Sequence, residues 1–163
     1  MKTGHNTTVF ARLAHAVAVV CLGLIAGTAL AHILEMPHKM AMDREMWFSV
    51  QSLIYNGWGI KIQWLAIAAM LGLSVSMVLH RRRVPWSLLA IALLLVSDVV
   101  VFLIWVNPTN LAVDAAVLGQ PLTDWKELRA QWEWGHFTRT WVMALATLCA
   151  AMSMPASSRG DRT

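Results

Sequence analysis

The sequence predicts an all-α integral membrane protein, a four-helix transmembrane bundle formed by a single domain of 163 residues. Hydrophobic residues make up 58% of the chain, charged residues only 13%, and the apolar residues gather in four runs. Soluble domains carry about 25% charged residues, and one this small has too little interior to bury so much apolar surface. The composition therefore excludes ordinary soluble, disordered and collagen-like classes, and the lipid bilayer is the first expected partner.

The apolar runs place the four expected spans at about residues 13–33, 62–79, 84–106 and 135–154. A helix needs about 20 apolar residues to cross a bilayer. The last run is apolar only over 140–154, which at ~1.5 Å per residue gives about 22 Å, short of the ~30 Å hydrocarbon core. The fourth span must therefore begin near Gly135, which brings His136 and Arg139 to membrane depth. The small, polar tail 155–163 is expected to fray.

The basic residues predict that both termini are cytoplasmic, in a multi-pass protein of the bacterial inner membrane. Lys and Arg gather on the cytoplasmic side of membrane proteins, and the strongest such cluster is Arg81-Arg82-Arg83 in a very short loop. Segments 35–61 and 107–135 then lie outside. Because the positive charge of +4 is explained by topology, we expect no nucleic acid partner.

The first span also permits a second interpretation. Lys2 and Arg12 precede an apolar run that ends in Ala29-Leu30-Ala31, the A-x-A pattern of signal-peptide cleavage. The run is longer than the ~7–15 residues of a signal core, which favours retention. Cleavage after Ala31 stays open at this point, and it would make His32 the mature N-terminus.

Both outer segments are expected to hold short interfacial helices. Residues 43–56 have helical spacing, with Trp47 and Ile54 among the apolar positions. Asn107-Pro108 is expected to stop the third span. Asp124 with Glu127 three residues later is typical of a capping box, opening a helix of about 30 residues that runs into the fourth span.

Two His–Glu pairs are the strongest candidates for chemistry. His32 and Glu35 end the first span, while Glu133 and His136 begin the fourth, and residues three apart share a helix face. If the two spans are neighbours, depth matching brings the pairs together. Glu-x-x-His is the ligand spacing of di-iron bundles, so these four residues are candidate ligands of iron or copper, and haem is also conceivable.

Three interpretations of the polar residues stay open. They form structural ion pairs, Arg129–Glu133 and Asp98–Arg139, or a functional pocket without metal, or a metal or haem site. Ionisable residues at membrane depth are expensive and usually functional. Asp98 lies inside the third span, and Arg139 is its nearest cation in depth. The other histidines are taken as incidental: His5, His15, His38 and His80.

Hydrogen-bonding side chains near the outer ends of the spans are candidate substrate-binding residues. They are Asn107, Asn110, Trp132, Tyr55 and Asn56. Cys21 and Cys149 lie inside apolar runs, so both are expected to be free and buried.

The two clusters resemble the anthrone oxygenase-like family of small four-helix membrane proteins, which is largely a domain of unknown function. The resemblance rests on His32-x-x-Glu35 with Pro37, and on the stretch of residues 107–139 that contains Trp125-Lys-Glu-Leu-Arg129, Trp132-Glu133 and Gly135-His136. It implies a membrane bundle, and some fungal relatives oxidise a tricyclic anthrone to an anthraquinone.

The leading functional hypothesis is an oxygenase-like membrane enzyme acting on a hydrophobic, aromatic substrate. His32 or His136 would be the base, and Glu35 or Glu133 would orient it. Arg129 or Arg139 would stabilise an enolate oxygen. The alternative is a non-enzymatic membrane subunit or small transporter, in which the same polar residues are structural or relay protons or ligands. The sequence does not identify protein partners.

Overall fold

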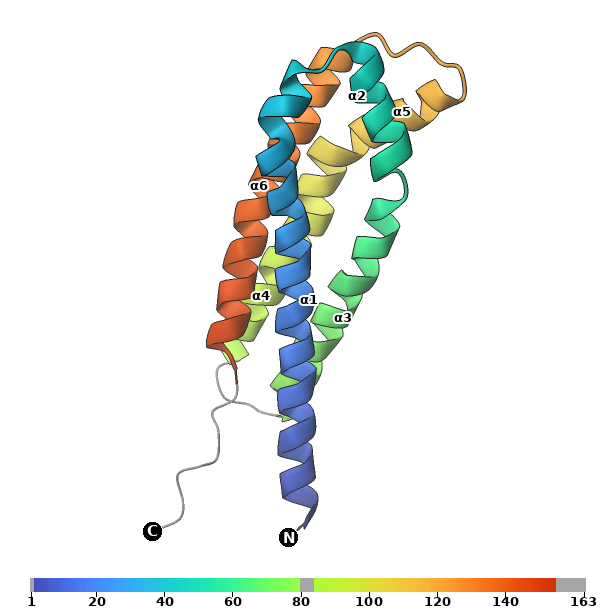
Figure 1. Ribbon diagram of the computed structural model, residues 1–163. Helices are drawn as coiled ribbons and strands as arrows, with labels where there is room; N and C mark the ends of the chain where they lie inside the picture. The colour runs from blue at the N-terminus through green and yellow to red at the C-terminus, as the bar shows by residue number, and fades with distance from the viewer. Residues whose placement is uncertain (1, 80–83, 155–163) are drawn as a thin grey trace.

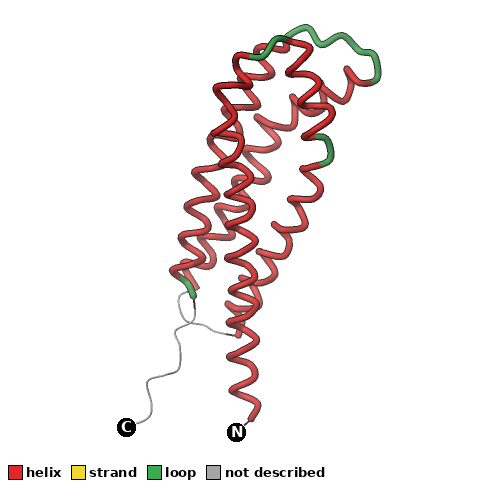
Figure 2. The backbone as a smooth tube through the Cα atoms, in the orientation of Figure 1, coloured by secondary structure: helices red, strands yellow, loops and turns green. Residues whose placement is uncertain are grey.

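The computed structural model describes residues 2–79 and 84–154, with side chains from Asn6 onward. Within these ranges every regular element is helical and no strand occurs (Figure 2). Three helical stretches are long and apolar enough to cross a membrane: Asn6–Ala41, Trp58–Leu79 and Val84–Val117. The predicted all-α class is confirmed, and these three helices have the length and hydropathy expected of membrane spans. The Arg81–Arg83 loop and the tail 155–163 lie outside the described residues.

Four long helical stretches form the bundle (Figure 1). They are α1 (Lys2–Ala41), α3 (Trp58–Leu79), α4 (Val84–Leu95) continued by η2 (Val96–Val106), and α6 (Trp125–Met152). α1 packs against α3 and α6, and α6 packs in turn against α4 and η2. The pair α1–α6 therefore forms the centre of the bundle.

Three short elements cover one end of the bundle, which we call the α2 end (Figure 1). They are α2 (Arg44–Val50), η1 (Gln51–Tyr55) and α5 (Asn107–Val117). Trp47 of α2 is fully buried there against Val113 and Leu122. The expected helix at 43–56 is thus present, but Ile54 is 54% exposed and does not join this core.

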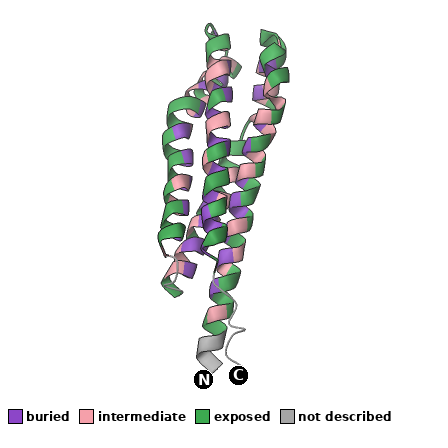
Figure 3. Cartoon of the chain, turned by 90° about the vertical axis from the view of Figure 1, so that its left-hand side faces the viewer, coloured by how far each residue is buried: buried purple, intermediate pink, exposed green. Residues whose placement is uncertain are grey.

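The core of the bundle combines alanines with larger residues such as Leu22, Leu73 and Met143, and the long helices carry both buried and exposed residues (Figure 3). Ala18, Ala69 and Ala90 are fully buried, whereas Leu71 is 61% and Val78 is 72% exposed. Lipid solvates the outer side chains as well as a protein core would, so close packing of small residues holds such helices together. Cys21 and Cys149 are free and buried, as expected.

One expected helix end is wrong, and one expected helix start is right but lacks its expected capping hydrogen bond. Asn107-Pro108 does not stop the third helix, because Pro108 occupies the first turn of α5 directly after η2, where the missing N–H costs nothing. Asp124 precedes α6, but its backbone (φ −95°, ψ 42°) is not extended and its side chain makes no capping hydrogen bond. The side-chain cap that is made belongs to α2, where Asp43 Oδ1 accepts from Met46 N at 2.8 Å.

A single glycine sets the closest approach of α1 and α3. A Cβ at Gly72 would lie 2.4 Å from the Ala14 carbonyl oxygen and 3.0 Å from Ala18 Cβ. These are backbone and short side-chain atoms that have no freedom to move aside. The two helices therefore pack at this distance only while residue 72 has no side chain.

We expect Gly72→Ala to destabilise the protein in detergent by about 1–3 kcal/mol, the usual cost of overpacking. The matched control is Gly23→Ala, because a Cβ at Gly23 meets nothing within 4 Å and alanine is the better helix former. Thermal unfolding of both variants checks this. Equal melting temperatures for the two variants would contradict the close packing.

Candidate functional site

Two histidines from the central helices meet inside the bundle near the α2 end. The imidazoles of His32 on α1 and His136 on α6 have ring centroids 4.1 Å apart, and both side chains are buried. The direct packing of α1 on α6 supplies the adjacency that the sequence argument required. Both histidines line a cavity of about 270 Å³.

The cavity lies between α3, η2 and the central helices. Trp58, Ile62 and Gln63 line it from α3, and Phe102 and Val106 line it from η2. α3 is held mainly by α1, which leaves this space between its first turns and η2. Its volume is just below the ~300 Å³ at which drug-sized pockets begin, so it suits a compact ligand of two or three rings.

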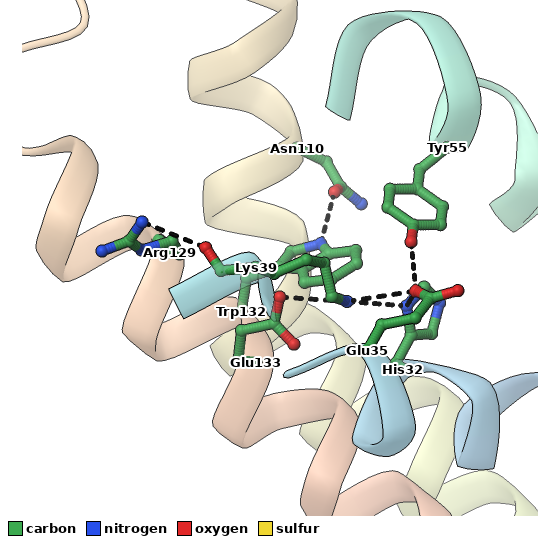
Figure 4. A network of polar contacts seen from close by, with 8 residues as sticks. All are labelled: His32, Glu35, Lys39, Tyr55, Asn110, Arg129, Trp132 and Glu133. Carbon is green, nitrogen blue, oxygen red and sulfur yellow. Dashed lines mark hydrogen bonds and ion pairs between the residues drawn. The ribbon is translucent and has the colours of Figure 1, made fainter. Parts of the chain in front are cut away.

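A lysine that the sequence analysis treated only as an outer charge lies at the centre of the polar contacts. The side chain of Lys39 is almost fully buried, and Figure 4 shows its ammonium between Glu133 on one side and Glu35 with His32 on the other. Nζ lies 3.0 Å from Glu133 Oε1 and 3.6 Å from Glu35 Oε2. It also lies 4.6 Å from the centre of the Trp132 ring. The available signal was helical spacing, since Lys39 lies four residues after Glu35 and seven after His32.

Lys39 fixes the hydrogen-bonding state of His32. The distance from Lys39 Nζ to His32 Nδ1 is 3.2 Å, and an ammonium group has only donors. Nδ1 therefore accepts, and in the neutral ring the proton is on Nε2. His32 thus presents a donor nitrogen on its other side.

The position of Lys39 favours an acid–base site over a metal site. Its ammonium occupies the space between Glu35, Glu133 and His32 where a shared cation would sit. Within the described ranges no three His, Cys, Asp or Glu side chains are arranged to hold a metal ion. The two imidazoles are also in contact with each other, so no porphyrin fits between them.

Burial tunes the acidic groups that surround Lys39. Burial raises the pKa of Glu133 to about 7, although the Lys39 ammonium favours the charged form. Burial also raises the pKa of the Tyr55 phenol, which donates to Glu35 Oε2 and is held protonated by that bond. Glu133 is therefore a group that exchanges a proton near neutral pH.

Asp98 and Arg139 form the ion pair expected from their depths. Arg139 Nη2 donates to Asp98 Oδ1 at 2.6 Å, and its Nε donates to Ser97 Oγ at 3.3 Å. Both residues line the cavity. Asp98 Oδ2 and His136 Nδ1 are buried and have no hydrogen-bond partner in the described part of the chain.

Arg129 does not reach the cavity, and it does not form the ion pair with Glu133 that the sequence analysis considered. Its Nη1 donates to the carbonyl oxygens of Lys39 at 3.1 Å and Met42 at 2.6 Å. These carbonyls lie at the C-terminal end of α1, where a cation also interacts favourably with the helix dipole. Arg129 therefore caps α1, and Glu133 pairs with Lys39 instead.

The candidate substrate-binding residues divide between two cavities. Tyr55, Asn110 and Trp132 line the cavity that holds the histidines, where Trp132 Nε1 donates to Asn110 Oδ1 at 3.0 Å. Asn56 and Asn107 line a neighbouring cavity. Sequence reasoning missed Trp58 and Phe102, whose apolar side chains resemble lipid-facing ones.

His15, taken as incidental in the sequence, is a fully buried link between three helices. Its Nδ1 lies 3.0 Å from Ser76 Oγ on α3, and its Nε2 lies 2.8 Å from the Ala150 carbonyl oxygen on α6. These bonds are far from the α2 end, so His15 contributes to bundle stability and not to the candidate site.

Comparison of the chain with protein-family models, curated proteins and solved structures gave no match.

We expect Asp98 and Arg139 to be energetically coupled. Removing one partner of a buried pair leaves an uncompensated charge and costs about 3–5 kcal/mol. A double-mutant cycle with Asp98→Asn and Arg139→Gln, measured by unfolding in detergent, should show that the double variant loses less than the sum of the single losses. Additive losses would mean that the two side chains do not interact.

Proposed function

We propose that the chain crosses a bacterial inner membrane four times, with both ends in the cytoplasm and the α2 end outside. Three apolar helices support this, and α6 provides the fourth span from about Gly135, because it packs along α1 in the centre of the bundle. The Arg81–Arg83 cluster favours a cytoplasmic position for the α3–α4 loop.

Cysteine labelling tests this topology. In a background with Cys21→Ala and Cys149→Ala, a membrane-impermeant maleimide should label Leu118→Cys in intact cells, because Leu118 is 84% exposed at the end of α5. Arg82→Cys should be labelled only after the cells are opened. The reverse pattern would invert the topology.

We propose further that the protein is a membrane oxygenase whose substrate is a hydrophobic, aromatic compound with an acidic C–H group, as in an anthrone. The observation that carries this is the apolar cavity in which two imidazoles meet, with Arg139 and Lys39 beside them. Such a cavity solvates a flat aromatic body, while its few polar groups act on one carbon and one oxygen atom.

In this proposal, different residues of the cavity act on the C–H proton and on the oxygen atom of the substrate. His136, with its unpartnered Nδ1, removes the C–H proton, and Arg139 stabilises the resulting enolate oxygen. Molecular oxygen, the co-reactant, then bonds to the carbanion carbon and gives a peroxide. Loss of the second C–H proton with cleavage of the O–O bond yields the ketone, so R₂CH₂ and O₂ become R₂C=O and H₂O.

A buried polar path connects the cavity to the groups at the α2 end. His32 lines the cavity, Lys39 contacts His32, and Glu133 pairs with Lys39. A pKa of about 7 lets Glu133 accept and release a proton at neutral pH. The same path favours the alternative function, a proton or ligand relay in a non-enzymatic subunit or small transporter.

An oxidation assay separates the two functions. We expect membranes with the wild-type protein to convert anthrone to anthraquinone with O₂ uptake, faster than the spontaneous reaction. His136→Gln should lower that excess rate by about 100-fold or more, since general bases contribute about 10²–10⁴.

The matched control is His38→Gln, because His38 is an exposed histidine on α1 outside both cavities, and its rate should equal that of the wild type. A wild-type rate no higher than that of protein-free membranes would reject the enzyme and leave the relay as the better hypothesis.

A further inference from the structure

A second cavity of about 230 Å³ adjoins the first at the α2 end. The two cavities share four lining residues: Tyr55, Gly59, Ile60 and Asn110. They are therefore adjacent compartments that meet at these four residues, one deeper in the bundle and one against α5 and η1.

The two compartments differ in chemistry. The deeper one has an apolar and aromatic wall that includes Ile62 and Phe102. The second is lined by four carboxamide side chains, from Gln51, Asn56, Asn107 and Asn110. Among the described residues that line it, Asp114 carries the only charge. A carboxylate or phosphate would meet no cation there and would face this acid.

Gln51 gives the second compartment an unused donor. The residue is only 5% exposed, and its Nε2 has no hydrogen-bond partner within the described ranges. A buried N–H group without a partner is costly, so such groups are normally satisfied. Asn110 adds a second donor, because its Oδ1 already accepts from Trp132 Nε1 and its NH₂ group is left for a ligand.

We propose that the two cavities bind one elongated, uncharged amphiphile. Its aromatic body occupies the deeper compartment, and a hydroxyl, ether or carbonyl oxygen at its other end accepts hydrogen bonds from Gln51 and Asn110. The inference rests on the aromatic binding of the function proposed above and does not require the oxidation step. It makes Gln51 the residue that selects for an oxygen-bearing end.

Three probes that differ in one group test the proposal by equilibrium dialysis against the protein in nanodiscs. They are 2-(2-naphthyl)ethanol, 2-propylnaphthalene and 3-(2-naphthyl)propionate. The wild-type protein should bind the alcohol more tightly than the carboxylate by about tenfold or more, and Asp114→Asn should narrow that gap. Carboxylate binding as tight as that of the alcohol would overturn the preference for an uncharged end.

The role of Gln51 is read by comparing the ratio of the dissociation constants of the propyl and alcohol probes between the wild type and the variant. The different partitioning of the two probes into lipid enters both ratios equally and therefore cancels. In Gln51→Met, a nearly isosteric change, the ratio should fall by about two- to tenfold, the value of one hydrogen bond. The matched control is Gln120→Met, at an exposed glutamine outside both compartments, and it should keep the wild-type ratio. An unchanged ratio in Gln51→Met would overturn the subsite.

The outcomes separate this inference from the proposed enzyme. If the wild-type protein discriminates between the three probes but does not oxidise anthrone, the amphiphile site is supported and only the proposed oxidation is rejected. Anthrone oxidation by the wild-type protein, with no discrimination between the probes by that same wild-type protein, would reject only the subsite. If Gln51→Met does not fold, the comparison of alcohol and carboxylate binding in the wild type and in Asp114→Asn still tests whether the site prefers an uncharged end.

Discussion

The burial of the Lys39 ammonium between α1 and α6 is the constraint on which the site depends. A charge removed from water is tolerated only with opposite charge and hydrogen-bond acceptors around it. Glu35 comes from the same helix, but Glu133 comes from α6, so the ion pair of Lys39 with Glu133 fixes the register of the two central helices. That register brings His136 level with His32.

The cavity follows from how the remaining helices attach to this central pair. Gly72 lets α3 approach α1 closely at the far end from α2, and Gly135 lets α6 approach η2, since a Cβ there would lie 2.9 Å from Val106 Cγ2. α3 thus packs closely on α1, whereas η2 packs closely on α6. The space left between them near the α2 end is lined mainly by apolar side chains, and Tyr55 of η1 borders it.

The π-helical backbone of η2 has a direct effect on the site. Asp98, Phe102 and Val106 follow one another at intervals of four residues, and all three line the cavity. A π-helix has a wider turn than an α-helix, with i→i+5 bonds, so residues four apart stay closer to one face. Arg139 on α6 then meets Asp98 from across the bundle. Nothing in an apolar run of this kind signals the wider turn.

The sequence by itself determined the all-α class, the apolar helices and the helical spacing within the two His–Glu pairs, because helical period and hydropathy are local properties. Only the tertiary structure decided the partners of the charged groups. In the folded chain Arg129 donates to the carbonyls at the end of α1, and Lys39 forms an ion pair with Glu133. The reason is that a long side chain reaches several neighbours, and the register between helices far apart in sequence selects among them.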